Sequence, residues 1–303
     1  MEEKSKKKTK AKGEYYIDVE EKNIRERAEG PISDRVYTLY DKNGNQYWSL
    51  KYEDVGEFNY NVFTVSNKGI TVVTRFDAEH SIVWLNKEGK VINRLSLDKC
   101  QEAYPRSIKN GNYWLIETGP DMMYHDNISG LAGVIICDAY GNKVNQIDYK
   151  HKEPEGLIIS RNGNYIMSCC TNWRANKYHS YLFTYTGRII KEYEGRDFTW
   201  RGSFSPDEKL FIGRGDGPRI IDTETGEVLA GFRSIGTYRV ANKETGIVAA
   251  TDFETLRIFN YNTEEKLFYM KLPKRPINLW ISGDGKEVSV SIKKHYYKYR
   301  MVE

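Results

Sequence analysis

The sequence is poor in the residues that cross-link small proteins or hold metals. It has 303 residues but only four cysteines and five histidines. The cysteines form no paired CxxC motifs, which excludes the usual disulfide frameworks and the common structural zinc sites. Adjacent Cys169 and Cys170 are predicted to be ordinary buried thiols whose side chains point to opposite faces of a strand. This cysteine usage favours a reducing compartment, so we predict a cytoplasmic location.

Long apolar runs are lacking as well. No segment of the sequence approaches the ~20 apolar residues of a membrane-spanning helix. The basic start leads into the polar segment EYYIDVEE rather than into the apolar core of a signal peptide. The sequence as written therefore predicts neither export nor membrane insertion, and a processed exported form stays an open alternative.

Familiar catalytic motifs are also lacking. The histidines show no metal-ligand spacing such as HxH or HExxH, and no GxSxG motif marks a serine nucleophile. We therefore predict no catalytic residue, no metal site and no cofactor. Carboxylates that converge from distant segments leave no local spacing, so an enzyme acting on an acidic or carbohydrate substrate stays the alternative.

The positive charge of the chain is concentrated at its start. Residues 1–13 hold six lysines and two glutamates, which equals the net charge of +4 of the whole chain and leaves the remainder neutral. We predict a flexible lysine-rich tail over 1–13 and a folded domain over 14–303. Such tails are usually only solvated, so nucleic acid is not an expected partner except through weak contacts with Lys4, Lys6, Lys7, Lys8, Lys10 and Lys12.

The most abundant feature of the sequence is one repeated segment. VYTLYDKNGNQYWSL begins at Val36, and similar segments are SIVWLNKEGKVINRL from Ser81, VIICDAYGNKVNQI from Val134 and RIIDTETGEVLAGF from Arg219. Each has alternating apolar residues on both sides of a polar turn, which is the pattern of a β-hairpin. The turns centre on Gly44, Gly89, Gly141, Gly187, Gly226 and, without glycine, Thr263-Glu264.

A second kind of hairpin alternates with the first. Examples are VFTVSNKGITVVTR from Val62 and SFSPDEKLFIG from Ser203. One unit therefore has four antiparallel strands, A to D, with tight turns between A and B and between C and D. Repeated four-stranded units of this size predict an all-β β-propeller, since no useful helical periodicity occurs.

One segment carries a family resemblance. SFSPDEKLFIGRGDGPRIIDTETGEVL (203–229) resembles a blade of the WD-repeat class, in which a Ser-Pro-Asp turn leads to an apolar strand and then to an Asp-x-x-x-Gly turn. It departs from that class in having no Gly-His pair and in having Ile221-Asp222 where Trp-Asp is common. VYTLYDKNGNQYWSL also resembles quinoprotein-type propeller repeats. The resemblance implies the superfold over most of 34–303 and does not define a function.

The number of hairpins sets the number of blades. Counting them favours a single propeller of seven four-stranded blades, with six as the alternative. The last blade has three recognisable strands, and a ring must close to remove its edges. We therefore predict that an N-terminal strand near Tyr15–Val19 completes the terminal blade.

Loop lengths point to one end of the blades as the binding face. The A–B and C–D turns are short, whereas the B–C connections include the insertions 118–133 and 171–180. Variable loops on a rigid frame are where binding residues tend to lie. We expect the B–C and D–A loops, which share one face, to engage a partner.

The predicted recognition residues are arginines with neighbouring aromatics. Three D–A connections end in such pairs, with Arg106 near Tyr104, Trp200 beside Arg201 and Tyr238 beside Arg239. Arginine forks and aromatic walls at a channel mouth would suit a carboxylate, a phosphate or an acidic peptide. We add Trp173 and Arg174 on the rim of that mouth. Pairing of each arginine with an acid of the next blade is the structural alternative.

These features predict a non-catalytic scaffold that binds a protein or peptide partner, an acidic one among the options, through the B–C/D–A face. Besides the enzyme, a third alternative is a structural subunit that docks through its outer strands and exposes an apolar patch on its rim. Four tryptophans within strands are predicted to be core residues: Trp48, Trp84, Trp114 and Trp280.

Overall fold

The structure is a computed structural model. It describes residues 14–27, 30–54, 62–75, 81–97, 101–120, 132–149, 153–172, 177–195, 199–214, 217–232, 236–293 and 295–300. The predicted tail 1–13 lies outside these residues. The chain divides into two compact units, residues 1–153 and 154–303. Among the described residues, no helix is long and apolar enough to span a membrane.

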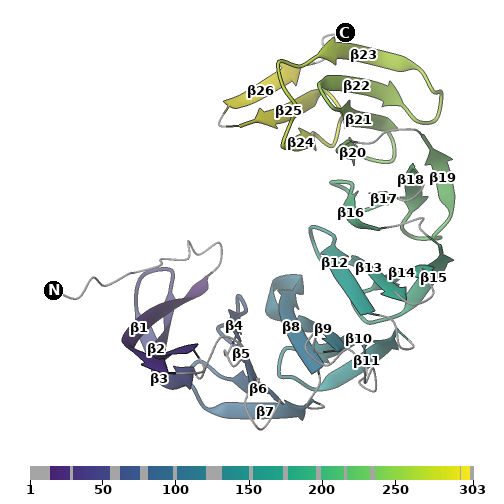
Figure 1. Cartoon of the computed structure of the whole chain (residues 1–303). Helices are drawn as coiled ribbons and strands as arrows, with labels where there is room; N and C mark the ends of the chain where they lie inside the picture. The colour runs from purple at the N-terminus through teal and green to yellow at the C-terminus, as the bar shows by residue number, and fades with distance from the viewer. Residues whose placement is uncertain are drawn as a thin grey trace. The chain divides into compact units, whose positions relative to one another are not determined.

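The described residues form antiparallel sheets of three or four strands, seven in all (Figure 1). The first unit holds the sheets β1–β3, β4–β7 and β8–β11. Its strands are β1 (Tyr15–Arg27), β2 (Gly30–Asp41), β3 (Gln46–Asp54), β4 (Val62–Val65), β5 (Thr71–Arg75), β6 (Ser81–Leu85), β7 (Val91–Ser96), β8 (Gln101–Ile108), β9 (Tyr113–Pro120), β10 (Gly133–Asp138) and β11 (Lys143–Asp148).

The second unit holds the sheets β12–β15, β16–β19, β20–β23 and β24–β26. Its strands are β12 (Glu153–Ile159), β13 (Tyr165–Asn172), β14 (Lys177–Thr184), β15 (Ile189–Glu194), β16 (Thr199–Phe204), β17 (Leu210–Arg214), β18 (Pro218–Asp222), β19 (Val228–Gly231), β20 (Tyr238–Val240), β21 (Ile247–Asp252), β22 (Thr255–Asn260), β23 (Lys266–Lys271), β24 (Asn278–Ile281), β25 (Glu287–Ile292) and β26 (His295–Arg300). The prediction of an all-β chain with seven repeated sheets is confirmed.

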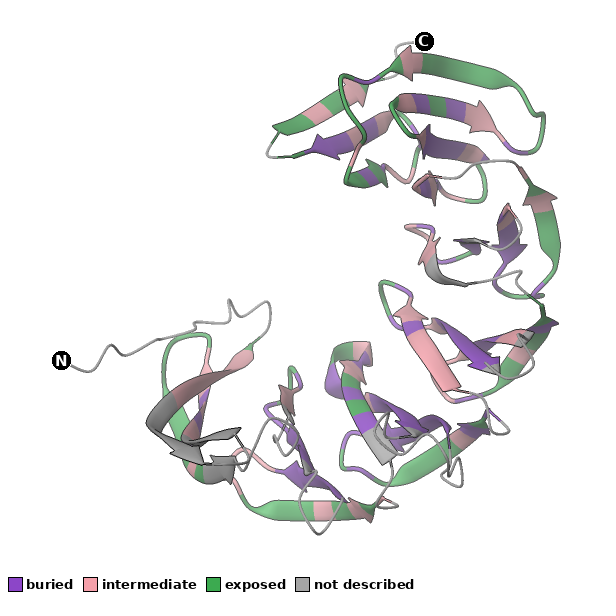
Figure 2. Ribbon diagram, viewed as in Figure 1, coloured by how far each residue is buried: buried purple, intermediate pink, exposed green. Residues whose placement is uncertain are grey.

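Burial changes from strand to strand within each sheet (Figure 2). All five residues of β6 are buried, whereas β7, the outer strand beside it, is largely exposed. The β10–β11 pair shows the same contrast. Inner strands are covered on both faces and read as continuous apolar runs, whereas outer strands alternate with polar residues. The core therefore lies between neighbouring sheets of each unit, as in the cluster that includes Trp84, Trp114 and Ile116.

The repeated segment forms a similar turn between strands C and D in each sheet where it occurs. The Asp41 carboxylate accepts hydrogen bonds from the backbone N–H groups of Asn43 and Asn45 (2.8 and 2.9 Å), and Asp138 plays the same part in a later sheet. All five predicted turn glycines have positive φ, and Glu264 takes this conformation (φ 58°) in the turn without glycine. Six sheets have a register shift between strands C and D beside this turn, with the extra residue in strand D. The shift is a β-bulge, which increases local twist.

The N-terminal strand differs from the prediction. Tyr15–Val19 pairs with Leu39 and its neighbours in β2, so it belongs to the first sheet. The described last sheet consists of β24, β25 and β26, and the proposed completion of that sheet by Tyr15–Val19 was wrong. The physical reason is local packing: Tyr15, Ile17 and Val19 share the face of Tyr37 and Leu39 and pack against the core of the first two sheets.

The A–B turns of the second unit are joined from sheet to sheet. Glu208, in the turn after β16, is 3% exposed, and its carboxylate accepts hydrogen bonds from Asn162 N–H and from Asn164 Nδ2 (2.6 Å) in the turn after β12. Asp207 accepts a hydrogen bond from the backbone N–H of Lys243 in the turn after β20 (3.1 Å). These bonds fix the turn end of the unit.

Candidate functional site

The loop end of the second unit presents an exposed group of apolar and basic side chains. Phe253 lies in the B–C turn between β21 and β22, and it is 61% exposed. The connection from β23 to β24 carries Arg275 and Ile277, and Ile277 is 68% exposed. We call Phe253, Arg275 and Ile277 the loop-end patch. Both of its segments lie on the B–C/D–A face predicted from the sequence.

Backbone and side-chain contacts hold this patch in place. Leu272 is buried in the core between the last two sheets, and its N–H donates a hydrogen bond to the Glu254 carbonyl (2.5 Å). The D–A connection is thus tied to the B–C turn. The Arg275 guanidinium carbon lies 6.0 Å from the centroid of the Phe253 ring, a cation–π distance.

Phe253 adopts an unusual backbone conformation. Its φ is 47°, a left-handed region that bulky side chains rarely enter. Strain of this kind costs of order 1–3 kcal/mol and clusters at functional sites. Phe253 is also largely exposed, so burial does not compensate for the strain.

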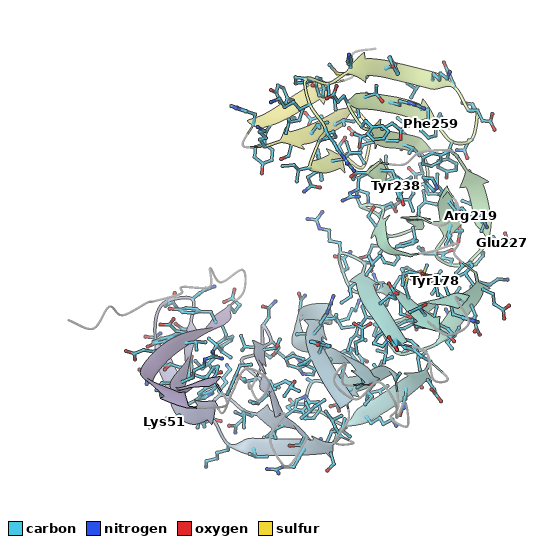
Figure 3. All side chains as sticks on the ribbon, in the orientation of Figure 1. Lys51, Tyr178, Arg219, Glu227, Tyr238 and Phe259 are labelled. Carbon is cyan, nitrogen blue, oxygen red and sulfur yellow. The ribbon has the colours of Figure 1, made fainter. Side chains whose placement is uncertain are left out.

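The predicted recognition residues have different surroundings. Tyr238 is 3% exposed and packs edge-on against Phe232, with ring centroids 6.2 Å apart, inside the core of the second unit (Figure 3). Trp200 and Arg201 lie on β16, and their side chains are outside the described part of the structure, as are Trp173 and Arg174 altogether. Arg106 is exposed on β8, and Arg239 is half-buried on β20.

Arg106 has an electrostatic partner in the first unit. Glu117 on β9 is 5% exposed, and its Oε1 has no hydrogen-bond partner among the described residues. Burial raises the pKa of the Glu117 carboxyl to about 7, although the positive charge of Arg106 acts in the opposite direction. This interaction lies within one sheet, whereas the structural alternative placed the acid in the next blade.

Arg239 lines a pocket of about 470 Å³ in the second unit. The lining comes from strands β12, β16, β20 and β24 and from the A–B turns that follow β12, β16 and β24. The side chain of Arg239 thus shares a pocket with residues of the turn end, whereas the sequence placed it at the loop end. We call this hollow the inner pocket.

Trp280 corrects a prediction from the sequence. It is 51% exposed and lines the inner pocket, whereas Trp48, Trp84 and Trp114 are buried as predicted. On β24 the burial alternates, with Leu279 and Ile281 buried in the core between the last two sheets. Trp280 points to the opposite face, because successive side chains of a strand alternate.

The rim of the second unit also has a hollow, of about 730 Å³. It lies along β19, β22 and β23, and Leu229, Phe268 and Tyr269 line it with exposed side chains. The structural-subunit alternative predicted an apolar rim patch of this kind.

The described cysteines behave as predicted. Cys137, Cys169 and Cys170 are buried, and none of them forms a disulfide within the described residues. Burial raises the pKa of the Cys137 thiol to about 12, so this thiol is not ionised near neutral pH.

The sequence matches no protein-family model and no curated protein. Its similarity to known proteins lies in the structure. A crystal structure of a eukaryotic initiation factor matches with a TM-score of 0.60 and 10% identity, over 94% of this chain and 76% of that one. The Dos1 propeller matches with a TM-score of 0.51 and 9% identity, over 89% and 75% of the two chains. The C-terminal WD40 domain of Sif2 matches with a TM-score of 0.48 and 11% identity, over 94% and 82%.

At these identities the matches show the fold alone. Together with the seven antiparallel sheets, they identify the fold as that of a β-propeller. The prediction of a β-propeller is confirmed at the level of the fold.

Proposed function

We propose that the protein is a non-catalytic propeller scaffold, folded over 14–303, that binds a protein partner through its B–C/D–A face. The observation that carries this proposal is Phe253, an exposed aromatic held at positive φ beneath Arg275. Exposed aromatic and arginine side chains are enriched among the residues that dominate binding energy. Ile277 extends the apolar surface on the same connection as Arg275.

The arginine and aromatic residues predicted from the sequence remain part of this proposal. Arg106, Trp173, Arg174, Trp200, Arg201 and Arg239 would supply polar and stacking contacts to an acidic segment of the partner. Tyr238 would act indirectly by anchoring β20 in the core, since its side chain is buried there.

The test is quantitative affinity capture with matched baits. The wild-type chain would be compared with a loop variant, Phe253→Ser with Ile277→Ser, and with a rim variant, Leu229→Ser with Tyr269→Ser. All substituted side chains are exposed, and thermal melts would verify that each bait is folded. A protein captured from lysate by the wild type and the rim variant, but lost by the loop variant, would support the proposal.

Equal capture by the loop variant would contradict it. Loss in the rim variant alone would assign the interface to the outer strands, as the structural-subunit alternative requires. A further bait, Arg106→Glu with Arg201→Glu and Arg239→Glu, would measure how much the three arginines contribute to partner binding. A captured partner that survives this triple change would limit their role to pairing within the propeller.

A further inference from the structure

The inner pocket has a composition that the proposed loop face does not explain. It lies at the turn end of the A strands, and its lining includes Ile158, Arg161, Phe204, Pro206, Arg239 and Trp280. Two of these side chains are cationic. None of the described lining residues is Asp or Glu, so the pocket carries positive charge without acidic groups in its wall.

Arg239 is the better buried of the two cations. It lies between Tyr238 and Val240, both buried, and its Nη1 donates a hydrogen bond to the Tyr238 carbonyl oxygen (2.7 Å). Burial lowers the pKa of this guanidinium, and the other influence on it comes from Tyr238 rather than from a carboxylate. A guanidinium has five N–H donors in a planar fork, and the hydrogen bond to Tyr238 uses one of them.

A buried hydroxyl in the same wall also lacks a partner. Ser203 on β16 lines the inner pocket, and its Oγ is buried with no hydrogen-bond partner among the described residues. A buried polar atom without a partner costs about 1–3 kcal/mol. A ligand with acceptor atoms would satisfy Ser203 Oγ and Arg239 together.

The remaining wall is apolar and aromatic. Trp280 is 51% exposed, and Phe204 packs edge-on against Phe211 with ring centroids 4.9 Å apart. Such walls favour a ligand whose anionic group is carried on an apolar stem. Arg161, in the turn after β12, is exposed and adds a second positive charge at the same hollow.

We propose that the inner pocket binds the carboxylate of an acidic side chain in an extended peptide segment of a partner protein. Arg239 and Ser203 would donate hydrogen bonds to the carboxylate, and Trp280 and Phe204 would contact the stem. A carboxylate accepts through two oxygens and matches the guanidinium fork. For Arg239 this proposal rests on the proposed function and refines the contact given to it there, whereas the inner pocket and the loop-end patch share no residue.

The test uses a defined probe, the fluorescently labelled peptide Gly-Leu-Glu-Glu-Leu-Gly, with a twin in which glutamine replaces both glutamates. Binding would be followed by fluorescence anisotropy. We expect Arg239→Gln to raise the Kd of the acidic peptide by roughly 10- to 100-fold, the range for a hydrogen-bonded charge. Ser203→Ala would raise it roughly threefold to tenfold. The glutamine twin would bind the wild type at least about tenfold more weakly.

The control is Arg257→Gln. Arg257 lies in the rim hollow and pairs with Asp252 at 3.0 Å, so this variant should bind like the wild type. Arg161→Gln, at an exposed turn, keeps the test decisive if Arg239→Gln fails to fold. Equal Kd values for the wild type and the variants of Arg239 and Arg161, or no binding by the wild type, would overturn the proposal.

Two competitors separate the sources of an anion. Glutarate carries the same carboxylate without a peptide, and inorganic phosphate carries a different anion. Weak competition by both, compared with unlabelled acidic peptide, would support a peptide ligand. Competition by glutarate or phosphate as strong as that of the peptide would overturn it in favour of a small free anion. The loop variant Phe253→Ser with Ile277→Ser should bind the peptide normally, which separates this result from the proposed function.

Discussion

Each end of the sheets has a residue with a strained backbone, but the surroundings of the two residues differ. At the turn end, Glu208 has a positive φ of 62°, and its buried carboxylate is fixed by hydrogen bonds from Asn162 and Asn164. At the loop end, Phe253 also has a positive φ, yet its ring is exposed with Arg275 above it. Backbone strain at Glu208 is offset by bonds between sheets. Strain at Phe253 is not, which is why we connect the loop end with binding.

Buried carboxyl groups sharpen the same contrast. Glu117 lies toward the loop end of β9, and its Oε1 has no hydrogen-bond partner within the described structure, unlike the satisfied carboxylate of Glu208. The folded pKa of about 7 is above the ordinary value of 4.5 for a glutamate carboxyl. The folded state therefore binds more protons between these values, and stability falls as the pH rises from 4.5 through 7.

The largest expected effect follows from Glu117→Gln. This change removes the cost of ionising a buried carboxyl and should raise the free energy of unfolding by up to roughly 3 kcal/mol at pH 8. At pH 4 the variant and the wild type should differ little. Urea unfolding at both pH values measures this, with exposed Glu88→Gln as the control. An unchanged pH dependence in the Glu117 variant would show that this carboxyl is solvated.

Glu208→Ala should come next, with a loss of about 2 kcal/mol in the free energy of unfolding. The change removes the carboxylate that accepts hydrogen bonds from Asn162 N–H and Asn164 Nδ2. Chemical denaturation at pH 7 measures the loss, and Glu227→Ala, at an exposed residue of the same sheet, is the matched control. Similar stabilities of the two variants would remove the argument that bonds between the A–B turns hold this end together.

A smaller effect is expected for Asp222→Asn. Burial raises the pKa of Asp222, but hydrogen bonds from Lys243 and from the turn N–H groups outweigh it, so that the folded pKa lies below 3.8. Its ionised form therefore stabilises the protein above that value, and this contribution is lost as the pH falls through the folded pKa.

The expected cost of Asp222→Asn at pH 7 is about 1 kcal/mol, because Lys243 is half-exposed and solvent screens the pair. Free energies of unfolding of the wild type and the variant, measured at pH 7 and at pH 2.5, test this pH dependence. The difference between the two proteins should shrink at pH 2.5, and a larger difference there would contradict the stabilising role of the ionised carboxylate.

The smallest effect concerns Phe253. Glycine adopts positive φ without strain, so Phe253→Gly should be more stable than Phe253→Ala by about 1 kcal/mol. Both variants lose the ring, so the difference between them reports only the cost of the positive φ at this position. Differential scanning calorimetry resolves the difference as a shift in Tm. Equal Tm values would show that the turn is unstrained.

The repeat made most of the fold predictable. Hairpin turns at Gly44, Gly89 and Gly141 were readable because each combines a side chain that accepts backbone N–H bonds with a glycine at positive φ. The partner of Tyr15–Val19 was not readable. Alternation of apolar residues defines a strand and its buried face, but several sheets could accept the same edge strand.

The binding residues were harder to foresee. Trp280 has the pattern of a strand residue, and the sequence does not tell which of the two strand faces is covered. Phe253 gave one usable signal, a turn between two apolar strands in Asp252-Phe253-Glu254 that contains neither glycine nor proline. Ser203 and Arg239 lie far apart in the sequence, and only the packing of their two sheets side by side brings them into one pocket.

The β-bulge in the outer strands, at Leu267 in β23, has a consequence for solubility. Outer strands such as β23 expose Leu267, Phe268 and Tyr269 along an open backbone edge, which is the feature by which chains add to one another in aggregates. The bulge twists this edge, and Lys266 and Lys271 place charges at the two ends of β23. A flat strand of another copy finds no matching register there. The bulge and the charges are thus features that oppose polymerisation through the repeated edges.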